Sequence, residues 1–137
     1  MRELEYILKL RRDIDSVELR LEELKSLVYP GSQIISDMPR GGGYKNKLEE
    51  YIVKWDKLKG KKHRLEMEIL RRWAAMEERF RECNVTEAQR DVMKYRFFYG
   101  RTWKKCVYHM RAEYPEAMWN EQKLFRIYRK VLEKTDM

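Results

Sequence analysis

An unbroken heptad repeat at the start of the chain constrains the fold more than any other feature of this sequence. Apolar residues recur three and four positions apart over the first 28 residues, at Ile7, Leu10, Ile14, Val17, Leu21, Leu24 and Val28. Such a seam, flanked by charged residues, predicts an α-helix that packs along its length on another helix. Tyr29-Pro30-Gly31 ends this helix, because proline and glycine disfavour helical geometry.

A second apolar stripe at helical spacing supplies the partner helix. It runs through residues 45–82, at Leu48, Ile52, Trp55, Leu58, Leu65, Ile69, Trp73, Met76 and Phe80. We therefore expect residues 1–82 to form an antiparallel helical hairpin, a coiled-coil arm with a glycine-rich connector at 30–44. In this hairpin the seam residues Ile14, Val17, Leu21 and Leu24 face Trp55, Leu58, Leu65 and Ile69.

Two details of this arm carry further predictions. Gly60 is a poor helix former and Lys62 stands where an apolar residue is due, so a bend or fray is expected there. Surplus leucines widen the apolar face of the first helix beyond one seam, at Leu4, Leu8, Leu19 and Leu27. Because surplus apolar surface usually marks an interface, we expect a homodimer.

The C-terminal part of the chain has the signals of short helices. Thr86 begins the first with a capping box, and Gly100 ends it. A second helix begins at Thr102 and ends before Pro115, which biases its preceding residue away from helical geometry. Asn120 is a good N-cap for the last helix. The fold is therefore predicted to be all-α, with residues 84–137 as a separate small domain.

The last helix has one apolar side and one cationic side. Its apolar side carries Leu124, Ile127, Val131 and Leu132. Gln122, Lys123 and Arg126 lie near its N-terminal end, and their amide and cationic groups suit the base edges of a DNA major groove. The cations expected on phosphates are Arg101, Lys104, Lys105, Arg129 and Lys130.

A family resemblance follows from the order of these residues. The pattern T..QR.V...R...G.TW from Thr86, followed by N...LFRIYRKVL from Asn120, resembles region four of bacterial sigma factors. It is more closely similar to phage late transcriptional activators of the ArpU and RinA kind, and the connector SDMPRGGG at 36–43 extends the likeness. The resemblance implies a helix-turn-helix in which Trp103 opens the first helix and the run from Arg126 to Leu132 forms the recognition helix.

The resemblance also implies a function. It indicates a sequence-specific DNA-binding transcription regulator of phage or prophage origin, whose arm serves dimerisation or contact with RNA polymerase.

The chain departs from the family pattern at Cys106-Val107, where an Ile-Ala pair is usual. Its connection from Met110 to Asn120 is also roughly seven residues longer than the usual turn, so the pattern no longer specifies the crossing angle of the two helices.

The charge balance agrees with a polyanionic partner. The formal net charge is +8, and residues 86–134 hold 12 Lys and Arg against 6 Asp and Glu. A second cationic stretch, at 54–64, is interpreted as a solvated helix face or as a secondary phosphate track. The chain has no long apolar run and charges fill its N-terminus, which predicts a cytoplasmic protein without a membrane partner.

Enzyme chemistry finds no candidate residues. The only histidines are His63 and His109, and the pair Cys106 and His109 lacks further ligands for a metal site. The glycines at 41–43 lack the spacing of a phosphate-binding loop. We therefore expect no catalysis, no cofactor, no metal and no small-molecule substrate. Two alternative functions stay open: a DNA-packaging protein like a phage terminase small subunit, and a coiled-coil adaptor that binds proteins.

Overall fold

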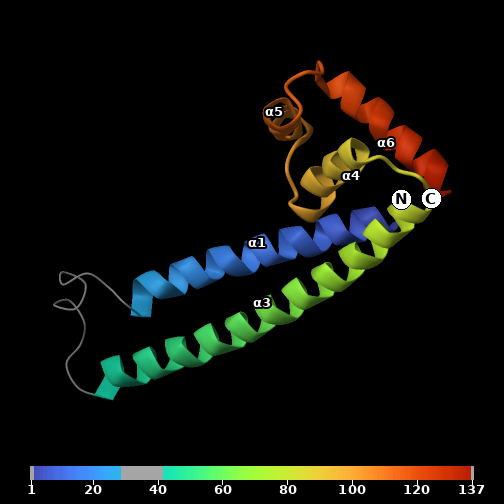
Figure 1. Ribbon diagram of the computed structural model, residues 1–137. Coiled ribbons are helices and arrows are strands. Elements are labelled where there is room, and N and C mark those ends of the chain that lie inside the picture. The colour runs from blue at the N-terminus through green and yellow to red at the C-terminus, as the bar shows by residue number, and fades with distance from the viewer. Residues whose placement is uncertain (1, 29–41, 137) are drawn as a thin grey trace. The chain divides into compact units, whose positions relative to one another are not determined.

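The computed structural model describes residues 2–28 and 42–136, and the regular structure in these ranges is entirely helical. The elements are α1 (Arg2–Val28), α3 (Gly42–Glu82), α4 (Glu87–Met93), a π-helical segment η1 (Lys94–Phe98), α5 (Trp103–Glu113) and α6 (Glu121–Thr135) (Figure 1). The predicted all-α fold class is confirmed.

The long helices differ from the prediction at two places. α3 begins at Gly42 rather than at Lys45, because the entropic cost of glycine in a helix, about 1 kcal/mol per residue, disfavours helical geometry without forbidding it. The rest of the predicted connector, up to residue 41, lies outside the described residues. α3 also runs unbroken through Gly60, so the expected fray is absent. Lys62 stays at the edge of the seam, where its ammonium lies 3.4 Å from Glu18 and 3.8 Å from Glu66.

The chain divides into two compact units, and each long helix contributes one end to each. Unit 1 comprises Met1–Arg12 and Glu68–Met137, and unit 2 comprises Asp13–Met67. The sequence placed the boundary near residues 82–84 instead. The last turns of α3 belong with the C-terminal helices because they pack on them. The ring centres of Trp73 and Phe98 lie 5.7 Å apart, and Arg79 Nε donates to the Thr135 carbonyl at 3.2 Å.

The core of unit 1 uses both long helices. Its fully or nearly buried side chains from them are Leu4, Ile7, Leu8, Leu10, Ile69, Trp73, Met76 and Phe80. Leu4 and Leu8 were expected to be surplus residues available to a second copy. They are only 0% and 8% exposed, so these two leucines serve the chain's own core.

In the π-helical segment, the consecutive residues Phe97 and Phe98 pack on aromatic side chains of different helices. Tyr99 N–H donates to the Lys94 carbonyl at 3.0 Å, five residues back, which adds one residue to the helical turn. Phe97 stacks on Tyr128 of α6 at 5.6 Å, whereas Phe98 packs on Trp73 of α3. The extra residue therefore joins the C-terminal helices to the long helices within unit 1.

In unit 2, the segments of α1 and α3 lie side by side and run in opposite directions (Figure 1). The side chains of Ile14, Val17 and Leu21 are buried, with exposed fractions of 8% or less. Leu24 of α1 and Leu58 of α3 are half-buried. Unit 2 thus has a narrow apolar core.

Candidate nucleic-acid interface

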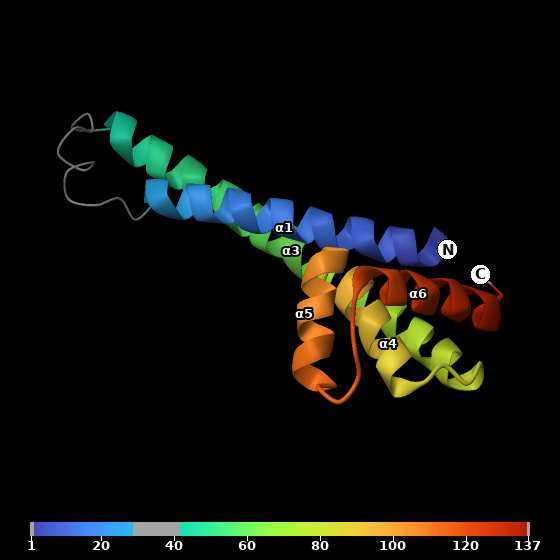
Figure 2. The same ribbon diagram turned by 90° about the horizontal axis from the view of Figure 1, so that it is seen from above.

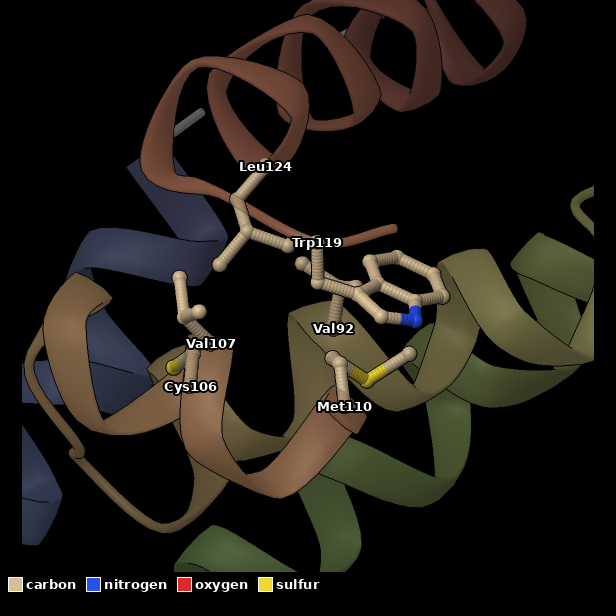
Figure 3. Close-up of a cluster of buried hydrophobic side chains, with 6 residues drawn as sticks. All are labelled: Val92, Cys106, Val107, Met110, Trp119 and Leu124. Carbon is tan, nitrogen blue, oxygen red and sulfur yellow. The ribbon is translucent and has the colours of Figure 1, made fainter. Parts of the chain in front are cut away.

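Helices α4, α5 and α6 meet around one apolar cluster in unit 1. Figure 3 shows its buried members, which are Val92, Cys106, Val107, Met110, Trp119 and Leu124. Each of the three helices contributes, and so does the connection between α5 and α6. The cluster therefore fixes these three helices relative to one another.

The long connection between α5 and α6 has a fixed path. It returns from the C-terminal end of α5 to the start of α6 (Figure 2). Trp119 is 6% exposed, and its indole N–H donates to the Tyr114 carbonyl at 2.9 Å. The guanidinium of Arg111 donates to the Trp119 carbonyl at 3.1 Å, and the Tyr114 hydroxyl donates to Asp91 at 2.6 Å. This hydrogen bond to Asp91 raises the pKa of Tyr114, because it stabilises the protonated phenol.

Local chemistry sets where α5 begins. Gly100 has φ +68°, a left-handed conformation that ends η1, and Thr102 Oγ1 accepts the Lys105 N–H at 3.3 Å as the N-cap of α5.

Arg96 donates to the Arg101 carbonyl at 3.0 Å, and its guanidinium carbon lies 5.1 Å from the centre of the Trp103 ring. Burial lowers the pKa of Arg96. The predicted starts and stops at Thr86, Gly100, Thr102 and Asn120 are confirmed.

One face of α6 gathers four of the predicted DNA-binding residues. Gln122, Arg126, Arg129 and Lys130 lie at positions i, i+4, i+7 and i+8, and all four are exposed. The opposite face buries Leu124 and Val131 at 0% exposure. Among the described residues, no carboxylate forms an ion pair with these three cations. Glu133 lies on the same face at its C-terminal end.

The predicted residues of α5 and its start lie in different surroundings. Lys104 lines a groove with Tyr108, Arg111, the N-cap Asn120 and the first residue of α6, Glu121. Lys105 is exposed at the first turn of α5. Arg101 lines another hollow, formed by α4, η1 and α5. The structure therefore brings Lys104 to the N-terminal end of α6, and Arg101 to a hollow that α6 does not line.

Lys123 differs from the other predicted residues, because its ammonium already has partners. Lys123 Nζ donates to the Met118 carbonyl at 2.7 Å and lies 4.0 Å from the centre of the Trp119 ring. Its backbone N–H donates to Asn120 Oδ1 at 2.8 Å, which completes the N-cap of α6. Lys123 thus holds the connection against the start of α6.

The hollow lined by Arg101 is also where acidic groups gather. Asp91 and Glu113 line it, and His109 stacks on Tyr95 there with ring centres 4.5 Å apart. Burial and then the charges of Asp91 and Glu87 raise the pKa of Glu113. Lys94 lines the hollow as well, so its lining mixes acidic and basic groups, whereas the outer face of α6 carries mainly cations.

Sequence reasoning missed two residues of the α5 groove. Tyr108 is 58% exposed beside Lys104, and Arg111 lies one turn further along the same face. Their spacing from Lys104, four and seven residues, was a signal that they share its face. Nothing in the spacing of Trp119 indicated that it would anchor the connection between α5 and α6.

The described residues hold no helix of the length and apolarity that a membrane crossing requires. Within the same ranges, no three His, Cys, Asp or Glu side chains are grouped as a metal ion would need. No family model, no curated protein and no solved structure matches this chain.

Proposed function

We propose that the chain binds double-stranded DNA through α5 and α6, which act as a helix-turn-helix, and that it regulates transcription. One observation carries the proposal: a single face of α6 presents Gln122, Arg126, Arg129 and Lys130 to solvent while its opposite face anchors the helix in the core. A rigid, exposed, cationic helix face is the element that a major groove accepts.

The chemistry along α6 suggests a division of contacts. Gln122 and Arg126 lie in its first two turns, where a recognition helix meets base edges. Arg129 and Lys130 come one turn later and meet phosphates, as do Lys104 and Lys105 at the start of α5. Lys123 serves as a positioning residue, because reaching a base would break its contacts with Met118 and Trp119.

The distribution of charge supports one direction of approach. The hollow lined by Asp91 and Glu113 also contains Lys94 and Arg101 and so has no excess of cations, whereas the outer face of α6 presents Arg126, Arg129 and Lys130 and attracts a phosphate backbone. The fixed connection between α5 and α6 also favours the proposal, since a recognition helix must hold its angle to the first helix.

Transcriptional regulation is the biological role that the sequence resemblance implies. A DNA-packaging protein would use the same helices in a ring of many subunits, and a protein-binding adaptor would bind no DNA. The size of the complex on DNA, measured by sedimentation, separates these roles from a regulator that binds as one or two chains.

The salt dependence of binding to a random duplex tests the proposed contacts. The full chain is required, because a fragment from Val85 to Met137 would lack Trp73, on which Phe98 packs. Fluorescence anisotropy should give a slope of log K against log salt of about −4 for the four phosphate contacts proposed per chain. Lys105→Ala should flatten this slope by about one.

A matched cation outside the interface provides the control. Lys61 is exposed in the Lys-rich stretch of unit 2, so Lys61→Ala should leave the slope unchanged if that stretch is a solvated face. A wild-type slope near zero, or equal losses from Lys61→Ala and Lys105→Ala, would refute the proposed interface.

A further inference from the structure

A groove between α1 and α3 of unit 2 has an acidic rim and a basic rim. Its lining from α1 includes three carboxylates and one cation, Asp15, Glu18, Glu22 and Lys25, and its charged lining from α3 is Lys59 and Lys62; the apolar lining is Leu19, Leu21 and Trp55. The rims continue the charge of their segments. Residues 13–28 hold 5 acidic and 2 basic side chains, whereas residues 42–67 hold 4 acidic and 8 basic side chains.

Contacts within the chain leave part of this charge available. Lys62 pairs with Glu18, but Lys59 lies 5.4 Å from the centre of the Trp55 ring instead of against a carboxylate. Among the described residues, neither Asp15 nor Glu22 forms an ion pair. The groove therefore presents the carboxylates of Asp15 and Glu22 on one side and the ammonium of Lys59 on the other.

The apolar part of the groove is also incompletely covered. Leu19 is 63% exposed at its edge, and Trp55 is half-buried. Two helices alone bury one seam, whereas four helices enclose a core from all sides. A second pair of helices with complementary charge is the partner that this groove fits.

We propose that unit 2 is the surface through which two copies of this chain form a dimer. A twofold axis parallel to the helices places α1 of each copy on α3 of the other, so the acidic rim of each copy meets the basic rim of its partner. A twofold axis across the helices would instead place α1 on α1 and α3 on α3. That arrangement opposes like charges, so the charge pattern selects the first. Glu22 then faces Lys59 of the partner subunit.

Sedimentation equilibrium of the full chain without DNA tests this dimer independently of the proposed function. The wild type should have a mass of about 34 kDa, twice the 17.0 kDa of one chain. Glu22→Lys and Lys59→Glu each place like charges across the interface and should weaken dimerisation at least about tenfold. Both positions are exposed, so the far-UV circular dichroism of each variant should equal that of the wild type.

Mixing the two variants distinguishes contacts between chains from contacts within one. The ammonium introduced at position 22 of one variant meets the carboxylate introduced at position 59 of the other only across the interface. An equal mixture should therefore recover about 34 kDa as a heterodimer, twice the 17.0 kDa of one chain. Met67→Asp is the control, since Met67 is 54% exposed and does not line the groove, and this variant should stay dimeric. A monomeric wild type at tens of micromolar, or a mixture that stays monomeric, would overturn the proposal.

Discussion

Replacing Gly100 with alanine should destabilise the protein for two reasons that the structure separates. Gly100 has φ +68°, and a left-handed backbone costs an alanine about 1–2 kcal/mol. The added Cβ would also lie 2.7 Å from Arg11 Cγ, so Arg11 must move. Arg11 Nε donates to the Phe98 carbonyl at 2.7 Å, and losing such a charged hydrogen bond costs about 1.5–3 kcal/mol. The free energy of unfolding should fall by about 3 kcal/mol.

A second glycine gives a matched control with the opposite sign. Gly60 lies inside α3, and a Cβ there would meet Arg64 Nη1 at 3.5 Å, an ordinary contact. Alanine has a higher helix propensity than glycine, so Gly60→Ala should raise the free energy of unfolding by about 0.5–1 kcal/mol.

Urea denaturation followed by far-UV circular dichroism measures both changes in the full chain. In an Arg11→Ala background the collision is gone, so Gly100→Ala should cost only the backbone part, about 1–2 kcal/mol. A Gly100→Ala variant within about 0.5 kcal/mol of the wild type would refute the reasoning. An equal cost in both backgrounds would refute its steric part.

The remaining predictions concern the unit 2 seam, a helix cap and a buried thiol. Val17 is 2% exposed, so Val17→Asp should lower the free energy of unfolding by about 3 kcal/mol or more, and unchanged thermal stability would contradict this. Asn120→Ala removes the acceptor of the Lys123 N–H and should cost about 1 kcal/mol in urea denaturation, whereas Gln122→Ala, at an exposed position, should cost little. Burial raises the pKa of Cys106 from 9.0 to about 11. The unfolded chain therefore loses this proton at a lower pH than the folded chain, so the free energy of unfolding should fall by about 1.4 kcal/mol per pH unit between pH 9.0 and about 11. Cys106→Ala should remove this part of the pH dependence.

The parts of the fold that local chemistry decides could be predicted from the sequence. The capping box at Thr86 and the N-cap at Asn120 depend on residues within four positions of each other. The two faces of α6 follow from its period, because exposed and buried residues alternate with the helical turn. These rules need no knowledge of distant contacts.

The parts that depend on distant contacts could not be predicted. A heptad pattern indicates that a helix is packed but does not identify its partner, so Leu4 and Leu8 gave no sign of joining the core of unit 1. Arg11 and Phe98 are 87 positions apart, and no local pattern links them. The same limit applies to the site. The partners of Lys123 Nζ, the Met118 carbonyl and the Trp119 ring, depend on the path of the connection between α5 and α6, which no local pattern specifies.

Selection of bound sequences from random double-stranded DNA by the full chain tests the central claim most directly. We expect a defined sequence to be enriched and to bind more tightly than random duplex at physiological salt. Arg126→Ala should then lose about 1–3 kcal/mol on the selected sequence and relax the preference at one base position. Equal binding of selected and random duplexes, or binding of neither, would contradict the account that the exposed face of α6 reads DNA.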